Sequence, residues 1–392
     1  MKRFDAIVLG LGAMGSAAAY QLAKRGGKIL GLDQYAPPHT RGSSHGDTRI
    51  TRLAIGEGAQ YTPLALRSHE LWRDIERETG ARLMQQTGAL IISSPAKTSF
   101  THVEGFFDNT VAAAQKYGIA HELLEATEIR RRYPPFKVGD DEVGYFEKEA
   151  GFLRPEACVR SQLALALKHG AEIHTEERTV GFDCSASAVA VTTDRAAYAA
   201  EHLILTAGPW LPELLGERLA RRFRVFRQVL FWFDIDGDES AFRPERFPVF
   251  IWELKGRSQG IYGFPAIDGA RGGVKVATEQ YGATTTPAKV DRYVAPEEIA
   301  AMHRDYVGPY LSGLSSRCLK TATCLYTVTP DFGFVIDAHP SCERVLVVSP
   351  CSGHGFKHSA AIGEAIAERV VDGACRLDLS GFKAERFAEA LD

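Results

Sequence analysis

The sequence of 392 residues predicts an α/β fold with two domains, the first of which is interrupted by the second. Three observations indicate this fold. A short apolar run, a glycine-rich turn and a helical pattern open the chain, as in a βαβ unit. Similar strand and helix patterns return at about residues 145–215 and again after about residue 325. The stretches between them contain helical patterns and aromatic-rich strands, and no clean linker separates the two kinds of sequence.

The opening unit is a strand, a turn, a helix and a second strand. Residues 5–9 form an apolar run long enough for a buried parallel strand. The alanine-rich segment 16–25 predicts a helix, which two glycines end. Residues 28–32 predict a second apolar strand, and this strand ends on Asp33.

Three glycines occupy the turn between the first strand and the helix, with the spacing G-x-G-x-x-G. Gly10 allows the sharp turn, Gly12 lets the backbone approach a pyrophosphate, and Gly15 lets the helix pack closely on the strand. The positive end of the helix dipole then faces the anion. Asp33 lies about 20 residues further on, where an acid binds ribose hydroxyls. The unit therefore predicts a dinucleotide site, and it leaves NAD and FAD as alternatives.

Composition and charge exclude several classes of partner. Apolar residues make up 45% and charged residues 24%, which is ordinary for a soluble globular protein. The net charge of −3 gives no reason to expect nucleic acid or a membrane surface as a partner. No apolar run reaches the ~18 residues of a spanning helix, no secretory signal is visible, and the scattered histidines suggest no metal cluster. Seven cysteines without a C-x-x-C pair predict a reduced, cytoplasmic protein.

The remaining elements follow from apolar periodicity and from glycine and proline signals. Helical spacing predicts helices at residues 62–79, 157–168, 296–310 and 359–371, and residues 100–132 are predicted to be mainly helical. Alternation or apolar runs predict strands at residues 88–93, 171–175, 189–193 and 344–349, one from residue 202 into a small-residue turn, and several within 225–280.

A basic cluster follows the loop formed by residues 36–44. His45, Arg49 and Arg52 lie within eight residues of one another, directly after the nucleotide strands, and folding alone explains them poorly. A ligand site is one explanation, because α/β folds place ligands in loops beyond the strand ends. A solvated basic turn is the alternative.

Four separated motifs need one explanation, and together they resemble a known family. They are Gly10–Gly15, His45–Arg49, Thr206–Trp210 and Ser352–Lys357. The motifs resemble those of the monomeric sarcosine oxidase and N-methyltryptophan oxidase family of flavoenzymes, within the larger group of FAD-dependent amino-acid oxidases. The resemblance covers nearly the whole chain, and it implies FAD in place of NAD. Further matching runs are residues 42–50, Gly56–Gly58 with Tyr61, and Cys324–Thr327.

The resemblance also implies a domain organisation that agrees with the interrupted pattern. It implies a discontinuous FAD-binding Rossmann-like domain and a second, substrate domain built on a mixed β-sheet. We expect the FAD-binding domain to comprise residues 1–86, 142–220 and 322–392, and the substrate domain residues 87–141 and 221–321. A broad interface between them would hold the cofactor.

For the cofactor, the resemblance implies a covalent link and a set of contacts. Cys324 matches the cysteine that holds the flavin through a thioether, although a buried structural thiol is the alternative. His45 and Arg49 match residues close to the flavin ring, where a cation favours electron uptake. The expected FAD contacts are Gly10, Gly12, Gly15, Asp33, Ser43, Thr48, Val180, Gly208, Cys324, Gly353, Gly355 and Lys357.

For the substrate, Arg52 and Lys357 match the family's carboxylate-binding pair, and a buried arginine suits a carboxylate. A solvated Lys357 at a helix N-terminus is the alternative, but a lysine there opposes the helix dipole. Lys275 matches the lysine that activates oxygen, although a lysine in an aromatic strand can also extend to solvent. Tyr262 and Tyr326 match active-site tyrosines, and either can instead be plain core.

Two positions depart from the sarcosine-specific pattern. Glu279 replaces a histidine near the substrate, and Ile55 replaces a tyrosine. An acid at residue 279 near the amine end puts sarcosine itself in doubt. It would favour a more basic or larger amine, or one with a second cationic group.

The sequence therefore predicts an FAD-dependent oxidase of secondary, N-methylated amino acids. The expected products are hydrogen peroxide and an imine, which hydrolyses to formaldehyde and the demethylated amino acid. The expected partners are a small amino acid and molecular oxygen, and a monomer is expected. The alternatives are an oxidase of cyclic secondary amines such as pipecolate or proline, a dehydrogenase with another electron acceptor, and a flavoprotein that binds its ligand without turnover.

Overall fold

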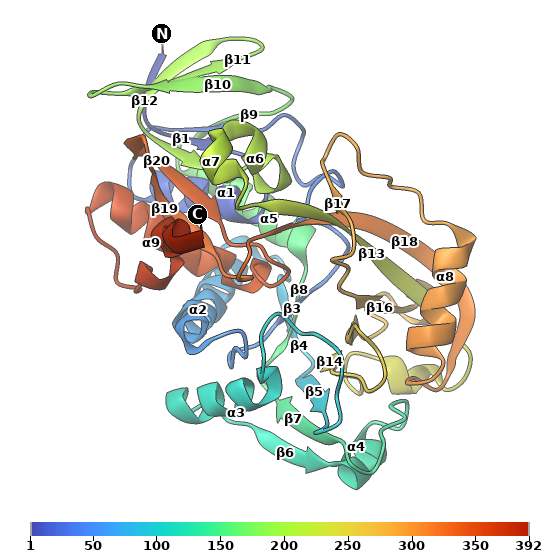
Figure 1. Ribbon diagram of the computed structural model, residues 1–392. Helices are drawn as coiled ribbons and strands as arrows, with labels where there is room; N and C mark the ends of the chain where they lie inside the picture. The colour runs from blue at the N-terminus through green and yellow to red at the C-terminus, as the bar shows by residue number, and fades with distance from the viewer. Residues whose placement is uncertain (1, 391–392) are drawn as a thin grey trace.

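Two large sheets organise the computed structural model, which describes residues 2–390. Within that range the chain forms an eight-stranded sheet, a nine-stranded sheet and a small three-stranded sheet. The eight-stranded sheet lies in the upper part of Figure 1, and the nine-stranded sheet extends along the lower right. The chain crosses between the two sheets repeatedly, so each sheet is built from segments that are discontinuous in sequence.

The eight-stranded sheet carries the opening unit of the sequence. Its main path has the order β10-β11-β12-β1-β2-β9, and β20 pairs with β12 and β19. Strands β1, β2, β9, β12 and β20 are joined by parallel pairings, as a nucleotide-binding sheet requires. The strands are β1 (Lys2–Leu9), β2 (Ile29–Leu32), β9 (Glu172–His174), β10 (Thr179–Cys184), β11 (Val189–Thr193), β12 (Ala197–Leu205), β19 (Val335–His339) and β20 (Cys342–Ser349).

Four helices cover one face of this sheet with a continuous apolar core. Helix α1 (Ala13–Lys24) packs between α5 (Pro155–Lys168) and α9 (Ser359–Val371), and α2 (Thr62–Thr79) packs on α9. Small residues permit the close approach, since a Cβ added at Gly363 of α9 would overlap Ala17 of α1. Two short helices, α6 (Leu211–Leu214) and α7 (Glu217–Ala220), lead out of this domain.

The nine-stranded sheet is mixed, because β14 pairs in parallel with β5 and its other pairings are antiparallel. Its main path has the order β17-β13-β16-β15-β14-β5-β7-β6, and β18 pairs with β13. The strands are β5 (Ala89–Ser93), β6 (Glu122–Glu125), β7 (Val143–Glu147), β13 (Arg224–Ile235), β14 (Val249–Trp252), β15 (Ile261–Phe264), β16 (Val274–Thr278), β17 (Thr284–Thr285) and β18 (Leu314–Val328).

Smaller elements complete the fold. The three-stranded sheet joins β3 (Arg49–Thr51), β8 (Gly151–Leu153) and β4 (Met84–Gln86). Helices α3 (Phe106–Tyr117), α4 (Ala126–Arg132) and α8 (Pro296–Met302) lie outside the second sheet. Strand β7 lies inside the predicted segment 142–220, and the end of β18 lies inside 322–392, so both segments contribute to the second sheet as well. The division into the predicted segments stays a prediction.

Two expectations about helices need correction. Residues 100–132 are not mainly helical, because β6 separates α3 from α4, and β6 is a strand through its pairing with β7 at the sheet edge. The predicted helix 296–310 ends earlier as an α-helix, at Met302, and continues as a π-helical turn over His303–Val307.

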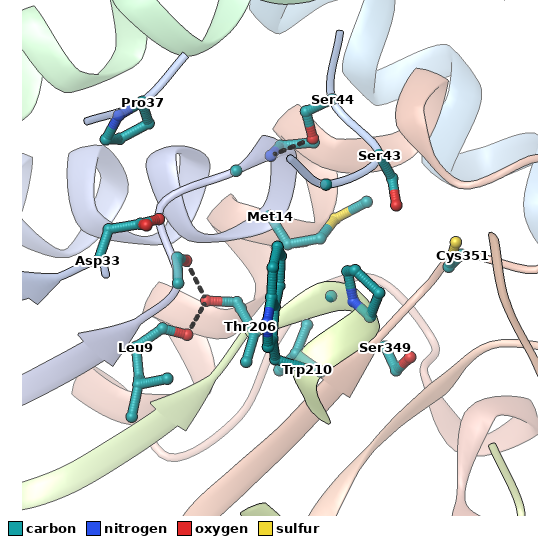
Figure 2. A pocket seen from close by; sticks show the side chains of 18 of the residues that line it. Leu9, Met14, Asp33, Pro37, Ser43, Ser44, Thr206, Trp210, Ser349 and Cys351 are labelled. Carbon is teal, nitrogen blue, oxygen red and sulfur yellow. Dashed lines mark hydrogen bonds between the residues drawn. The ribbon is translucent and has the colours of Figure 1, made fainter. Parts of the chain in front are cut away.

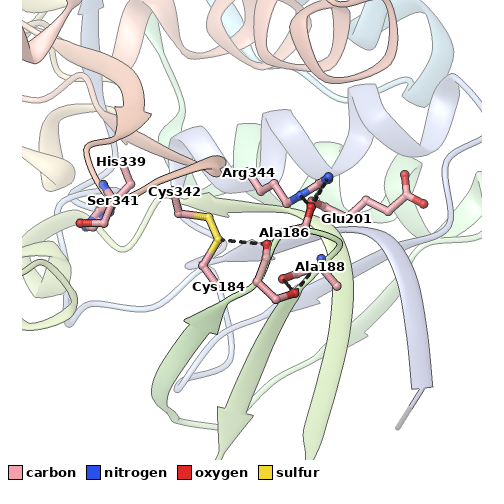
Figure 3. The surroundings of a disulfide bond; sticks show 9 residues. Cys184, Ala186, Ala188, Glu201, His339, Ser341, Cys342 and Arg344 are labelled. Atoms are coloured by element: carbon pink, nitrogen blue, oxygen red, sulfur yellow. Dashed lines mark hydrogen bonds between the residues drawn. A yellow bond between two sulfur atoms is a disulfide. The ribbon is translucent and has the colours of Figure 1, made fainter.

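The expectation that all cysteines are reduced was wrong for two of them. Cys184 at the end of β10 forms a disulfide with Cys342 at the start of β20, with their Cα atoms 6.3 Å apart (Figure 3). Only the sheet brings together residues separated by 158 positions. Arg344 donates to the carbonyl oxygen of Ala186 beside the bridge, at 2.9 Å. The free cysteines of the described chain are Cys158, Cys318, Cys324, Cys351 and Cys375.

Candidate active site

The first cavity lies at the carboxyl ends of the parallel strands, where the opening turn meets helix α1. It has a volume of about 220 Å³. Gly10 adopts φ +89°, and a Cβ added there would lie 2.7 Å from the carbonyl oxygen of Thr206, so the turn requires glycine. The Thr206 hydroxyl donates to the Leu9 and Gly10 carbonyl oxygens, at 2.9 and 2.7 Å, and fixes the turn (Figure 2).

The start of helix α1 is left open toward this cavity. Gly12 precedes the helix and lines the cavity, and its missing side chain leaves the first turn accessible. The Ala13 N–H donates to Ser44 Oγ at 3.0 Å, which holds the loop after residue 36 against the helix. Gly15 lies behind the cavity, where a Cβ would overlap the Gly10 carbonyl oxygen. This is the arrangement in which a helix N-terminus binds a pyrophosphate.

Asp33 closes the other side of the first cavity. Its carboxylate accepts hydrogen bonds from the N–H groups of Leu11, at 2.8 Å, and Tyr35, at 2.9 Å. A carboxylate offers about four acceptor positions, so Asp33 retains capacity for ribose hydroxyls at the cavity edge. Of the other predicted cofactor contacts, those that line this cavity are Ser43, Val180, Gly208, Gly353 and Gly355.

A second cavity of about 100 Å³ adjoins the first and faces the nine-stranded sheet. Arg49, Tyr326, Gly353 and Phe356 line both cavities, so the two are neighbours across these residues. The predicted residues found in the second cavity are Thr48, Arg52, Tyr262, Lys275, Glu279, Cys324 and Lys357. The structure thus brings the predicted substrate residues together from segments more than 300 positions apart.

Three predicted or suspected residues line neither cavity: Gly15, described above, His45 and Ile55. His45 is buried behind the first cavity, and its Nε2 has no hydrogen-bond partner among the described residues. Burial and the neighbouring cations Arg49 and Arg292 lower the pKa of His45 to about 3, so the ring is neutral. Ile55 is fully buried in the core between the first sheet and its helices, which removes it from direct contact with a substrate in the second cavity.

Half-buried Arg49 and buried Lys275 both line the second cavity, and Arg49 also lines the first. Arg49 donates to the carbonyl oxygens of Thr48 and Ser43, at 2.7 and 2.6 Å. Lys275 is 2% exposed, and its Nζ donates to the carbonyl oxygens of Gly46 and Thr48, at 2.8 and 3.0 Å. Lys275 therefore does not extend to solvent. Burial and the charge of Arg49 hold the pKa of Lys275 well below its usual value.

Cys324 lies on β18, where its register partner on the neighbouring strand β13 is Gln228. The thiol is 1% exposed and contacts the second cavity. Burial raises the pKa of Cys324, while Arg49 and Lys275 oppose that rise. The hydroxyl of Ser43 donates to the carbonyl oxygen of Leu325, the residue after Cys324. This bond joins the loop of residues 36–44, here called the cofactor loop, to β18.

Arg52 and Lys357 converge on one carboxylate, that of Glu57. Arg52 is 1% exposed, and its guanidinium forms an ion pair with Glu57 at 2.5 Å. Lys357 Nζ donates to the His354 carbonyl oxygen at 2.8 Å and lies 3.8 Å from Glu57 Oε1. Burial lowers the pKa of Lys357 to about 8. Burial alone would raise the pKa of Glu57, but Arg52 and Lys357 outweigh it and hold that pKa well below its usual range.

Sequence reasoning missed several residues of this site. Glu57 was part of a matching run but received no role, although its position five residues after Arg52 in a loop was a usable signal. His102 gave no signal, because it lay in a stretch predicted to be helical. In the structure, His102 adopts φ +46° in the segment before α3 and lines the second cavity. Trp210 and Ser44, which line the first cavity, also lay in matching runs and received no role.

Comparison with known proteins agrees with this site. The sequence model of the FAD dependent oxidoreductase family matches residues 5–369. The chain therefore belongs to the family of FAD-dependent oxidoreductases, and FAD is the cofactor of that family.

Individual relatives extend over the whole chain. Monomeric sarcosine oxidase of Streptomyces avermitilis is 40% identical over 99% of this chain and 98% of its own length. N-methyl-L-tryptophan oxidase of Yersinia pestis is 34% identical over 98% of this chain and 99% of its own length. Among solved structures, NikD, an amino acid oxidase of nikkomycin biosynthesis, superposes with a TM-score of 0.82 at 23% identity, over 98% of each chain. The structural likeness confirms the α/β fold with its Rossmann-like FAD domain.

The first cavity fits FAD on the evidence of its own residues. The bare backbone at Gly10 and Gly12, the open end of α1 and the carboxylate of Asp33 suit a pyrophosphate followed by a ribose. The junction with the second cavity, lined by Arg49 and Tyr326, suits the flavin ring. Within residues 2–390, no helix has the length and apolar composition needed to cross a membrane.

Proposed function

We propose that the protein is an FAD-dependent oxidase of secondary, N-methylated amino acids that forms an imine and hydrogen peroxide. The observation that carries this proposal is the buried pair Arg52 and Lys357 in the cavity next to the FAD site. Two buried cations beside an apolar wall suit a carboxylate attached to a small organic group. The relatives named sarcosine oxidase and N-methyl-L-tryptophan oxidase support the same substrate class.

FAD, when bound, supplies the acceptor for two electrons from the carbon next to the substrate nitrogen and passes them to oxygen. The protein orients the substrate by binding its carboxylate at Arg52 and Lys357. The aromatic walls of the cavity, which include Phe106, Tyr262 and Phe264, exclude water from the reacting carbon. The cationic surroundings favour a substrate amine that is bound without its proton.

Lys275 is proposed to promote the reaction with oxygen. Its Nζ is held by uncharged oxygen atoms and lies near the junction of the two cavities. Because Nζ is buried beside Arg49 and is held by neutral oxygen atoms, a proton on it would stabilise the negative charge that develops on oxygen as it is reduced. In Lys275→Met, substrate should still bleach the flavin, and recolouring in air should slow strongly.

Cys324 is proposed to attach the flavin covalently. Its side chain lines the second cavity beside Arg49 and Lys275, next to the junction where the flavin ring is expected.

We further propose that the protein acts as a monomer in the cytoplasm on a dissolved amino acid. The discontinuous division into an FAD-binding domain and a substrate domain, with the segments predicted from the sequence, belongs to the same proposal.

The test is anaerobic bleaching of the flavin by a panel of amines, followed by air. The panel contains sarcosine, N-methyltryptophan, other N-methyl amino acids, pipecolate and proline. Bleaching by an N-methyl amino acid, with recolouring and peroxide in air, is the expected result. Arg52→Met should abolish bleaching at low substrate concentration, whereas Arg317→Met, an exposed arginine paired with Asp234, should not. If no compound bleaches a flavin that dithionite reduces, the proposal is wrong.

A further inference from the structure

His102 and Glu279 form a partly buried ion pair, with side chains 8% and 18% exposed, that the proposed mechanism does not use. His102 lies in the segment between β5 and α3, and Glu279 follows the end of β16. His102 Nε2 lies 2.9 Å from Glu279 Oε1 and 3.1 Å from the Tyr281 hydroxyl. Its Nδ1 lies 3.9 Å from Glu57 Oε1. The imidazole therefore lies between two carboxylates, one of which also binds Arg52.

The carboxylates of Glu279 and Glu57 beside the ring favour a proton on His102, which then faces Glu279 as an imidazolium. Burial and Lys357 act to lower the pKa of His102, but the carboxylates of Glu279 and Glu57 outweigh them and raise that pKa above its ordinary value. The groups that face the ring are Glu57, Glu279, Tyr281, His354 and Lys357. Glu57 is shared by four basic side chains, whereas His102 is the one basic side chain of residues 2–390 within 4.0 Å of Glu279.

The pair lies beside Gly353, one of the four residues that line both cavities. A Cβ added at Gly353 would lie 2.8 Å from His102 Nε2, 2.9 Å from the Tyr326 ring and 3.0 Å from Glu279 Oε1. Both His102 and Glu279 line the substrate cavity. A substrate whose carboxylate is bound at Arg52 and Lys357 therefore shares this small cavity with the pair.

Resting on the proposed function, we propose that His102 and Glu279 are specificity-determining residues that bind an uncharged hydroxyl or amide group of the substrate. A hydroxyl or amide can donate a hydrogen bond to Glu279 and accept one from His102. A full charge of either sign is attracted by one member of the pair and repelled by the other, so the pair provides little net attraction to offset the loss of that charge's hydration. His102 thereby changes the expectation drawn from Glu279 alone, which was a preference for a second cation.

The test compares substrates that differ by one group. N-methylserine carries a hydroxyl where N-methyl-2-aminobutyrate carries a methyl group, and N-(2-hydroxyethyl)glycine and N-propylglycine show the same exchange on nitrogen. With the FAD-loaded protein, we expect kcat/KM for the hydroxyl compound of at least one pair to exceed that of its apolar partner by about tenfold or more, as for a hydrogen bond to a charged group.

Two variants and a control locate the effect. Both Glu279→Met and His102→Gln should strongly reduce the ratio of kcat/KM for the hydroxyl compound to kcat/KM for its apolar partner. In Glu279→Met this ratio should fall to about one. Glu298→Met removes a carboxylate paired with Arg227 outside both cavities and should keep the wild-type ratio. A ratio does not depend on the amount of folded enzyme, so poor folding of a variant does not conceal the result.

Calorimetry measures the same discrimination without turnover. In 2-methoxy-3-hydroxypropanoate and 2-methoxybutanoate an ether oxygen replaces the amine, so the ratio of their Kd values reports binding alone. Equal kcat/KM within both pairs, a preference for N-methyl-2,3-diaminopropionate or N-methylaspartate, or a ratio that survives Glu279→Met overturns the proposal. If no compound, sarcosine included, bleaches the flavin, the proposed function has failed, and the Kd ratio still decides the role of His102 and Glu279.

Discussion

Replacing Lys357 with methionine should weaken carboxylate binding and at the same time stabilise the folded protein. Burial lowers the pKa of Lys357 from its ordinary value of 10.5 to about 8. At roughly 1.4 kcal/mol per pKa unit, this gap corresponds to about 3 kcal/mol against the protonated amine in the folded state. At pH 7 Lys357 is protonated in both the folded and the unfolded chain, so the cost is carried in full. Methionine has a similar length and removes the charge.

The stability gain should depend on pH in one direction. Between about pH 8 and 10.5 the folded protein releases the Lys357 proton and the unfolded chain keeps it, so wild-type stability rises with pH over this window. The advantage of Lys357→Met should therefore be largest below pH 8, at up to about 3 kcal/mol, and should shrink toward pH 10.5. Urea unfolding at several pH values measures it.

Binding of a carboxylate should change in the opposite sense. Methoxyacetate, which lacks the amine, should bind about 10- to 100-fold more weakly to Lys357→Met, because one charge-assisted hydrogen bond is lost. Wild-type affinity should fall above about pH 8 as Lys357 loses its proton, and the variant should lack this step. Lys168→Met, an exposed lysine paired with Glu78, is the matched control. Unchanged affinity together with lower stability at pH 7 would refute the electrostatic reasoning.

Three further variants test other parts of the structure. Acid precipitation should leave the yellow colour in the wild-type pellet and release it from Cys324→Ser; colour in the wild-type supernatant would exclude the covalent link. Cys184→Ser should lower the free energy of unfolding by about 2–4 kcal/mol through loss of a long-range disulfide, and a reductant should destabilise the wild type but not the variant. Arg292 donates to carbonyl oxygens of the cofactor loop and of Thr323 on β18. In a Cys324→Ser background, Arg292→Met should therefore release FAD faster, as followed by free-flavin fluorescence, and an unchanged rate would remove Arg292 from cofactor retention.

The opening nucleotide unit was predictable because its signals are local. Gly10, Gly12 and Asp33 lie within about 25 residues, and each has a backbone or hydrogen-bonding role that the strand–turn–helix pattern itself requires. The structure places all three on the first cavity. The four core helices on this sheet were predictable for the same reason, since their apolar periodicity records the face that each one buries.

The sequence did not predict the edge strand β6, because its local pattern does not determine its structure. Its four residues are mostly exposed, and Leu123 is 60% exposed, so neither alternation nor a buried run marks them. They form a strand because β7 provides hydrogen-bonding partners along the sheet edge. The sequence did not predict the disulfide between Cys184 and Cys342 either, because the two cysteines come within bonding distance only after the sheet has formed.

The sequence by itself determined the dinucleotide unit, the α/β class and, through resemblance, a set of candidate residues around FAD. Only the tertiary structure decided which of these residues meet. In the structure, Lys275 points into the protein and Ile55 lies in the core, away from the second cavity. Glu57 lies beside both Arg52 and Lys357. Glu279 pairs with His102. The physical reason is the separation along the chain over which each interaction acts. Backbone propensity acts over a few residues and is written in the sequence, whereas charge pairing and burial act between segments that only the folded chain brings together.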